Sequence, residues 1–128
     1  MAKNLVVTEK PGVAQTLAAV LGAKKRGDGF FEGGDWLISW CYGHLVELAL
    51  ADAYGDQFKR WSYDALPILP DVWQYRASDG KKKKLDILHC LMNRADVDGI
   101  INACESGREG ELIFQLVYDQ TRCTKTVR

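Results

Sequence analysis

The feature that most constrains the fold is a pair of short apolar runs, each followed by a polar turn and an amphipathic helix. The first run is 4–8 (NLVVT), and a helix is predicted over 11–21, with a proline at its start and a glycine just past its end. The second run is 99–104 (GIINAC), and a helix is predicted after it over 109–119. Apolar runs without alternation are typical of parallel strands covered on both faces. The pattern predicts an α/β fold with a mainly parallel sheet flanked by helices.

The residues between these two units follow other patterns. Aromatic residues over 27–42, interrupted by the turn Gly33-Gly34-Asp35, predict an inserted β-hairpin. The stretch 51–80 lacks a clean period, and we expect its aromatic residues to hold it or another domain to cover it. The lysine run 81–84 leads into a helix predicted over 85–95. For this run we favour a solvated face over contact with phosphate.

Size and charge limit the chain to one domain and restrict its partners. A length of 128 residues allows one α/β domain with a hydrophobic core, but not two. Lys+Arg and Asp+Glu number 17 each, whereas a free-standing DNA-binding protein usually has a basic excess. If the chain contacts nucleic acid, we expect it to borrow positive charge from the rest of a larger protein.

Apolar runs and cysteines bear on the cellular location. No apolar run approaches the length of a membrane span, and the first four residues do not open a signal peptide, so no membrane partner is expected. The cysteines show no CxxC spacing, and three of them lie in apolar segments. This usage fits reduced, core-filling thiols in a cytoplasmic protein, with structural zinc as a minor alternative.

Acidic residues stand on both strand-to-helix turns. Glu9 follows the first predicted strand, and Glu105, Glu109 and Glu111 follow the second. Both turns are expected at the carboxyl edge of the sheet, where ligands bind in open α/β folds. Converging carboxylates there would repel one another without a cation, and Mg²⁺ accepts oxygen ligands and suits phosphoryl transfer. The alternative is a solvated helix start, because acids favour a first turn; we prefer that interpretation for Glu111.

The second turn also contains groups suited to phosphate. Gly107 and Gly110 flank Arg108 at a predicted helix start, where backbone N–H groups attract anions and a guanidinium can bind two oxygens. A Gly-x-x-Gly spacing alone is weak evidence. It matches neither the GxxxxGK[ST] phosphate loop nor the dinucleotide GxGxxG.

Four segments together resemble a known family. TEKPGVAQTLAAVLG, GDGFFEGGDWLISWCYGHLVELALADAYGDQFKRW, LPILPDVW and NACESGREGELIFQLVY resemble, in order and at compatible spacing, the Toprim domain of type IA DNA topoisomerases of the bacterial topoisomerase III kind. The resemblance covers nearly the whole chain. It implies a Rossmann-like Toprim fold and a Mg²⁺-dependent enzyme that cuts one DNA strand, passes another through the gap and reseals the break.

The resemblance also implies roles for residues on the two turns. Glu9 corresponds to a glutamate that assists proton transfer at the 3′ leaving oxygen and contributes to the metal site. Lys10 corresponds to a lysine that stabilises charge at the cleaved phosphate, a role that we also expect for Arg108. Glu105 and Glu109 correspond to the first and last acids of a DxDxE metal motif.

Two positions depart from that motif. Glu105 is a longer carboxylate than the usual Asp, and Gly107 occupies the second acidic position. Some relatives of this branch also have glycine at the second position, so its absence does not by itself imply inactivity. Fewer protein ligands predict a looser, more water-rich Mg²⁺ site.

Two further residues of the resemblance are expected near DNA, each with an ordinary alternative. Trp61 corresponds to a tryptophan close to the DNA and could stack on a single-stranded base, but packing under the irregular segment is equally plausible. His44 belongs to a recurrent Gly-His pair; it could contact DNA, orient a carboxylate or be a satisfied histidine at the hairpin end. Trp36, Trp40 and Trp73 we assign to the core.

No segment here resembles the family's nucleophilic tyrosine, which lies in a downstream domain. We therefore expect residues 1–128 to be the N-terminal Toprim domain of a larger multidomain protein, inactive alone. Its expected partners are single-stranded regions of DNA and the downstream domains of the same polypeptide. The alternatives are another Toprim nuclease or primase, or a degenerate Toprim domain that binds DNA without catalysis.

Overall fold

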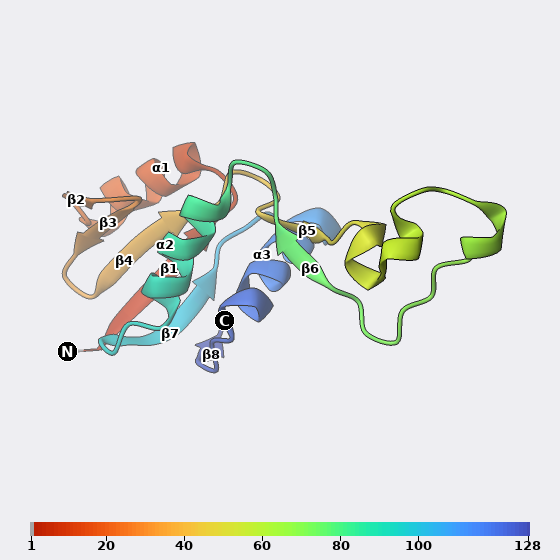
Figure 1. The fold of residues 1–128 in the computed structure, drawn as a ribbon. Coiled ribbons are helices and arrows are strands. Elements are labelled where there is room, and N and C mark those ends of the chain that lie inside the picture. The colour runs from red at the N-terminus through yellow and green to blue at the C-terminus, as the bar shows by residue number, and fades with distance from the viewer. Residues whose placement is uncertain (1) are drawn as a thin grey trace.

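A mainly parallel sheet forms the centre of the molecule. The computed structural model describes residues 2–128. Six strands are arranged in the order β2-β3-β4-β1-β7-β8 (Figure 1). The central strand β1 (Lys3–Thr8) pairs in parallel with β4 (Trp36–Trp40) on one side and with β7 (Val97–Asn102) on the other. The predicted α/β fold with a mainly parallel sheet is confirmed.

The first helix covers one face of this sheet. Helix α1 (Pro11–Leu21) ends at Gly22, whose φ of 76° gives the left-handed cap expected of a terminal glycine. Its buried residues are Ala14 and Ala18, which pack against Val6, Ile38 and Trp40. Small side chains let the helix approach the strands closely, so the larger valines of α1 remain on its exposed side.

The predicted hairpin forms as β3 (Phe30–Gly33) and β4, joined across the glycine turn, with β2 (Lys25–Gly27) added at the edge. It is not a separate ribbon. Because β4 pairs in parallel with β1, the hairpin extends the main sheet. The end of β4 therefore reaches the same edge of the sheet as the end of β1.

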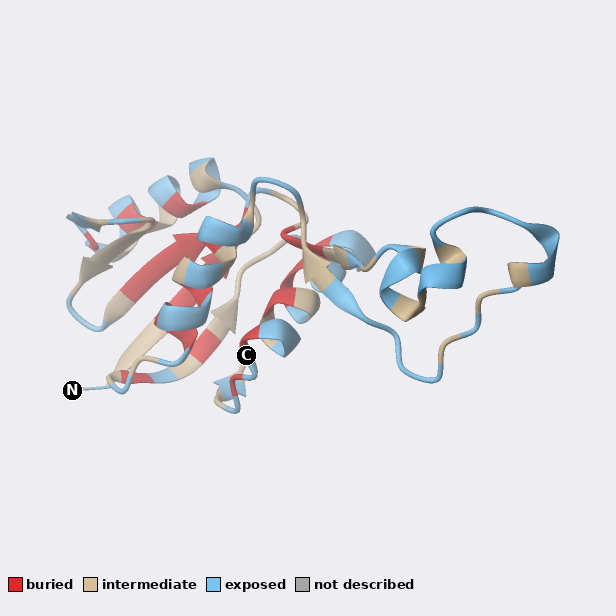
Figure 2. Ribbon diagram, viewed as in Figure 1, coloured by how far each residue is buried: buried red, intermediate tan, exposed pale blue. Residues whose placement is uncertain are grey.

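Two helices cover the other face. Helices α2 (Lys82–Met92) and α3 (Arg108–Thr121) pack against β1 and β7, and β8 (Thr126–Val127) pairs in parallel with β7. The core here includes Leu5, Val7, Leu88, Ile113 and Phe114. Figure 2 shows the buried residues concentrated in the strands and on the inner faces of the helices.

The irregular stretch projects away from the sheet (Figure 1). Strands β5 (Val46–Leu48) and β6 (Tyr75–Ala77) form its two-stranded base, and between them lie three short 3₁₀ helices, η1 (Ala51–Tyr54), η2 (Asp56–Phe58) and η3 (Tyr63–Ala65). An edge-to-face contact joins Tyr54 and Trp73, yet the latter is 52% exposed. Assigning Trp73 to the core was therefore wrong: the strands that would have covered it are far shorter than the segment.

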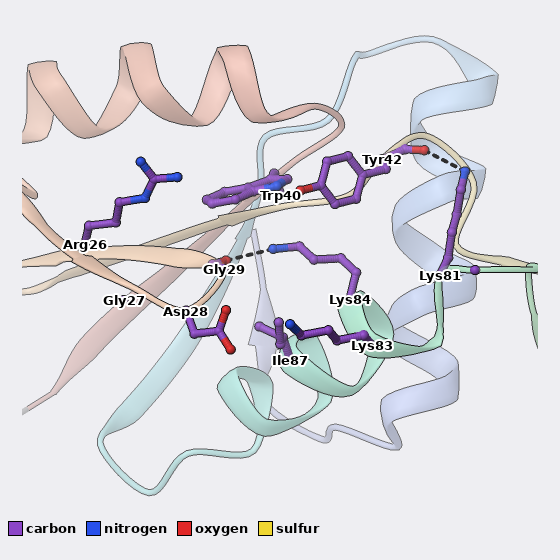
Figure 3. A pocket seen from close by; sticks show the side chains of 11 residues that line it. Arg26, Gly27, Asp28, Gly29, Trp40, Tyr42, Lys81, Lys83, Lys84 and Ile87 are labelled. Carbon is purple, nitrogen blue, oxygen red and sulfur yellow. Dashed lines mark hydrogen bonds between the residues drawn. The ribbon is translucent and has the colours of Figure 1, made fainter.

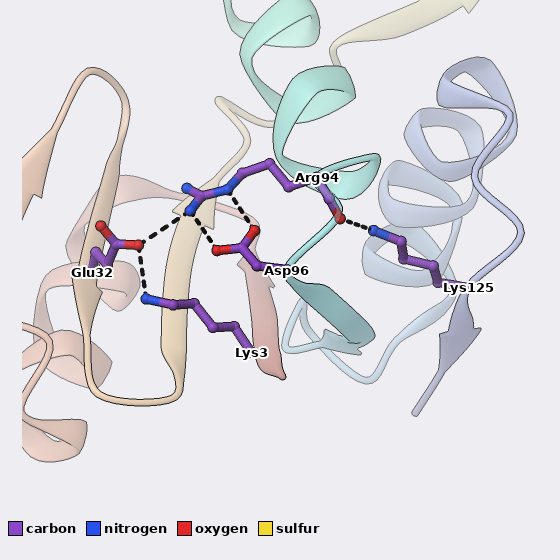
Figure 4. Close-up of polar contacts among 5 residues, drawn as sticks. All are labelled: Lys3, Glu32, Arg94, Asp96 and Lys125. Atoms are coloured by element: carbon purple, nitrogen blue, oxygen red, sulfur yellow. Dashed lines mark hydrogen bonds and ion pairs between the residues drawn. The ribbon is translucent and has the colours of Figure 1, made fainter. Parts of the chain in front are cut away.

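A network of ion pairs closes the amino end of the sheet, opposite the strand-to-helix turns (Figure 4). The Glu32 carboxylate of β3 lies 2.9 Å from Lys3 Nζ and 3.3 Å from a terminal nitrogen of Arg94. Hydrogen bonding to Lys3 holds the pKa of Glu32 below its usual value, and Arg94 does the same for the pKa of Asp96. Lys125 donates to the Arg94 carbonyl. These contacts join the start of β1 to the hairpin and to the entry of β7.

Within residues 2–128, none of the helices combines the length and the apolar character that a bilayer span requires.

Candidate functional site

The two acidic turns lie next to each other at the carboxyl edge of the sheet. Glu9 follows β1 and Glu105 follows the adjacent strand β7, beyond the paired residues Val7 and Asn102. The chain leaves β1 toward α1 and the hairpin side, whereas it leaves β7 toward α3 and β8. Connections that diverge from adjacent parallel strands create a crevice at the sheet edge, the usual ligand position in such folds. Glu9 is half-buried there and Glu105 is exposed.

Backbone and hydroxyl contacts fix the Glu9 turn. The Thr8 hydroxyl donates to the Lys10 carbonyl at 2.9 Å, and the Gly43 N–H donates to the Glu9 carbonyl at 3.2 Å. Gly43 has φ of +69°, a conformation that favours glycine and turns the chain from β4 across the end of β1. The structure therefore explains the Gly43-His44 pair. Gly43 holds the Glu9 backbone by a hydrogen bond, and His44 follows it at the carboxyl edge of the sheet.

A glycine holds the Glu105 loop against α3. A Cβ built on Gly110 would lie 2.2 Å from the Glu105 carbonyl oxygen, closer than real contacts allow, whereas one on Gly107 would meet nothing within 4 Å. Gly110 therefore serves close packing of backbone on backbone. We expected both glycines to leave room for a phosphate. Only Gly107 does so, because the space beside Gly110 is filled by the Glu105 backbone.

Asn102 shapes the same loop from the end of β7. Its side-chain oxygen accepts from the Cys104 N–H at 3.1 Å, and its side-chain nitrogen donates to the Glu111 carboxylate at 3.0 Å. Glu111 is thus attached to the strand end, in agreement with a structural interpretation. Sequence reasoning assigned Asn102 no role, although a polar residue at the end of an apolar strand is a usable signal.

His44 contacts the Glu109 carboxylate at the carboxyl edge of the sheet. Its Nε2 lies 2.8 Å from Glu109 Oε1, and both side chains are substantially exposed, 41% and 70% respectively. This contact fits both the carboxylate-orienting and the satisfied-histidine interpretations of His44. Lys81 Nζ donates to the His44 carbonyl at 3.1 Å and to the Tyr42 carbonyl at 2.9 Å, and so holds the turn that presents this histidine.

The carboxylates at the carboxyl edge of the sheet help to raise the pKa of two nearby thiols. Burial, and then the Glu9 and Glu111 carboxylates, raise the pKa of Cys104 to about 11. Burial also raises the pKa of Cys41 to about 12, with Cys104 and Glu9 adding to the shift. Both thiols stay protonated near neutral pH and are poor nucleophiles. All four cysteines are free.

The lysine run is not a uniform solvated face, contrary to our expectation. Lys82 and Lys83 are exposed, but Lys84 is 6% exposed and donates to the Gly29 carbonyl at 2.7 Å and to Ser39 Oγ at 3.1 Å. Lys84 lies four residues before Leu88, on the inner face of α2, so helical spacing places it inside despite its charge.

Other predicted site residues lie as follows. Lys10 is exposed directly after Glu9, and Arg108 is exposed at the first position of α3. Within residues 2–128 neither side chain forms an ion pair, so both remain available to an anion at the rim. Trp61 is 77% exposed on the projecting segment, which excludes the packing interpretation. The structure does not bring Trp61 into contact with the acidic turns.

The carboxylates do not form a complete metal cage. In the described part of the chain, no three or more His, Cys, Asp or Glu side chains are grouped so that they could hold a metal ion. Glu9 and Glu105, from adjacent strands, nevertheless suit Mg²⁺, which is commonly held by one or two carboxylates and keeps several waters. Zinc, which requires a compact set of nitrogen and sulfur ligands, lacks such a set here.

Comparison with known proteins agrees with this geometry. The Toprim domain family matches residues 4–128. Across all 128 residues the chain is 37% identical to DNA topoisomerase 3 of Bacillus thuringiensis (strain Al Hakam), 36% to that of Shouchella clausii (strain KSM-K16) and 34% to that of Bacillus subtilis (strain 168). It spans 18% of the length of each of these relatives. The fold, the paired acidic turns and the match over nearly the full length lead to one conclusion: the chain belongs to the Toprim domain family.

Proposed function

We propose that this chain is the N-terminal, metal-binding catalytic domain of a type IA DNA topoisomerase of the topoisomerase 3 kind, working within a longer polypeptide. The observation that supports it most is the juxtaposition of the Glu9 and Glu105 turns at the ends of adjacent parallel strands. The names and greater length of the relatives support the same assignment. A cytoplasmic location, where chromosomal DNA lies in bacteria, follows from this proposal.

In the proposed reaction, Glu9 gives a proton to the 3′ oxygen as its bond to phosphorus breaks on cleavage, and takes the proton back when the 3′ hydroxyl reseals the strand. Its turn is fixed by Thr8 and Gly43, so the backbone that carries the carboxylate has a set position. Lys10 and Arg108, both exposed beside the crevice, bind the phosphate and offset charge that develops on it. The reacting tyrosine would come from another domain of the polypeptide.

Glu105 and Glu9 would hold Mg²⁺, with Glu109 assisting. His44 occupies one oxygen of Glu109 and leaves the other free, an arrangement that orients a metal-binding carboxylate. When bound, Mg²⁺ would supply positive charge to the phosphate oxygens and help to align the strand. With Gly107 in place of a further acid, the site depends on fewer protein ligands. Trp61 and His44 are proposed to contact single-stranded DNA as well.

The test is Glu9→Gln in the longer polypeptide, assayed for cleavage and religation of a single-stranded oligonucleotide. We expect at least about a 100-fold loss of rate, the usual effect of removing a general acid or base. Glu111→Gln is the matched control, because glutamine can still accept from Asn102 and the rate should stay close to that of the unmodified protein. Full activity of Glu9→Gln would overturn the assignment.

A second candidate is a Toprim domain that binds DNA without catalysis. It is favoured by the lack of a group of three or more potential metal-binding side chains among residues 2–128. Calorimetric titration with Mg²⁺ and Mn²⁺, with and without a DNA oligonucleotide, separates the two. Metal binding that Glu105→Gln weakens supports the catalytic domain, and the absence of binding even with DNA supports the second candidate.

A further inference from the structure

A cavity of about 400 Å³ lies beside the acidic crevice, between the β2–β3 turn, the end of β4 and the start of α2. Its lining includes Arg26, Tyr42, Lys83 and Lys84 (Figure 3). We call this cavity the basic pocket. Its walls also contain Trp40 and Lys81, so that four cationic residues face a single carboxylate, Asp28. The chain as a whole has a net charge of zero, so this local excess marks a site for an anion.

Two of these cations are available to a ligand. Within the described residues, Arg26 and Lys83 form no ion pair, and both are exposed; Arg26 lines the pocket from the β2 side and Lys83 from the α2 side (Figure 3). Deeper in, burial lowers the pKa of Lys84 to about 8, since its ammonium lies 3.8 Å from the centre of the Trp40 ring with little water around it. An anion nearby would favour the charged form of this lysine.

The aromatic wall adds a second, independent observation. The indole Nε1 of Trp40 is buried and has no hydrogen-bond acceptor among residues 2–128. Buried donors are rarely left unpaired, because each costs about 1–3 kcal/mol, but this nitrogen has almost no accessible surface, so only a small acceptor such as water would pair with it. Next to it the Tyr42 ring is 51% exposed and offers a face on which a base can stack.

The position of the pocket relates it to the acidic crevice. Tyr42 is followed by Gly43, whose N–H donates to the Glu9 carbonyl, and by His44, which binds Glu109. A single strand with one phosphate at the crevice can therefore continue along this edge of the sheet. Stacking on an aromatic side chain requires a base with a free face, as in a single strand, so an unpaired nucleotide fits Tyr42 best.

We propose that the basic pocket binds one nucleotide of single-stranded DNA next to the crevice, its phosphate on Arg26 and Lys83 and its base on Tyr42. The proposal rests on the proposed function, since it assumes a DNA strand at the crevice. It adds a subsite that lies outside the acidic turns.

The test is the anisotropy of a fluorescein-labelled oligodeoxythymidylate of about ten nucleotides, a length within the usual site size of a single-strand binder. The 128-residue chain is titrated in EDTA, so that binding does not depend on a metal. Arg26→Gln with Lys83→Gln should weaken binding at least about 10-fold and lower the slope of log K against log salt by about 0.7, the contribution of one phosphate contact on a single strand. The control, Lys24→Gln with Lys82→Gln, removes the same charge from exposed residues outside the pocket and should change affinity less than about 2-fold.

Stacking is tested with Tyr42→Leu, which should weaken the oligonucleotide about 5-fold or more but leave an abasic strand of equal length unaffected. Three results would each overturn the proposal. The first is no binding of the oligonucleotide, and the second is an equal loss of affinity in the pocket and control variants. The third is equally good competition by thymidine monophosphate or polyglutamate. None of these results bears on the proposed function, which the cleavage assay of Glu9→Gln tests. The basic pocket and the proposed function can therefore fail separately.

Discussion

Gly110→Ala tests the packing that positions the Glu105 turn. The new Cβ would lie 2.2 Å from the Glu105 carbonyl oxygen and 2.9 Å from its backbone carbon and nitrogen. Ordinary contact begins at 3.4 Å, so either α3 or the loop must move by about 1.2 Å (3.4 minus 2.2). Neither partner is a flexible side chain, and overpacking of this kind costs about 1–3 kcal/mol.

Helix propensity opposes this cost. Replacing glycine with alanine inside a helix stabilises it by up to about 1 kcal/mol. We therefore expect a net loss of about 1–2 kcal/mol for Gly110→Ala. Gly12 is the matched control: it is the second residue of α1, as Gly110 is the third of α3, but a Cβ there meets nothing within 4 Å. Gly12→Ala should be neutral or more stable than the unmodified chain.

The assay is urea unfolding of the 128-residue chain followed by circular dichroism. With a typical slope of about 1–3 kcal/mol per molar, Gly110→Ala should lower the midpoint by about 1 M, whereas Gly12→Ala should leave it unchanged or raise it. If both variants shift the midpoint upward alike, the helix does not press on the Glu105 backbone. In the longer polypeptide, a displacement of about 1 Å should also reduce cleavage about 100-fold.

Three further predictions concern stability measured by urea unfolding. Lys84 loses its proton near pH 8 when folded and near 10.5 when unfolded, so stability should rise by about 1 kcal/mol from about pH 7.5 to about pH 9, and Lys84→Met should abolish this rise. Gly43→Ala should cost about 1 kcal/mol, and Gly43→Asn less, because asparagine tolerates a φ of +69° better. Glu32→Gln should cost about 0.5–1 kcal/mol by removing the pairs with Lys3 and Arg94. Because the folded pKa of Glu32 lies below 4.5, that difference should be present at neutral pH and disappear as the pH falls below about 4.5.

The strand-turn-helix units could be predicted from the sequence because their signals are local. An apolar run, a proline and a glycine determine where α1 begins and ends, and the left-handed Gly22 confirms the end. The same locality explains why both acidic turns were found: each stands directly after a run that must be a buried strand. That these turns are neighbours depends on strand order, which the sequence does not encode locally.

The errors arose where long-range packing overrides local pattern. Lys84 is buried because a hydroxyl, a carbonyl and an indole ring receive its ammonium, all from residues more than forty positions away. Trp73 is exposed because the projecting segment has too little surrounding structure to cover it.

The acidic crevice combines a fixed backbone with carboxylates that are partly or fully exposed. A hydroxyl and a glycine N–H hold the backbone of the Glu9 turn, and contact with Gly110 holds the backbone of the Glu105 turn. Neither turn therefore needs a metal to keep its backbone conformation. The Glu105 and Glu109 side chains are exposed, and water screens their repulsion in the absence of a cation. Binding Mg²⁺ would therefore require ordering of side chains but little backbone movement. Glu105 has one more rotatable bond than the aspartate usual in the family, so more of the binding free energy goes into that ordering. The expected result is a weak metal site that DNA phosphate completes, rather than a cage that binds Mg²⁺ alone.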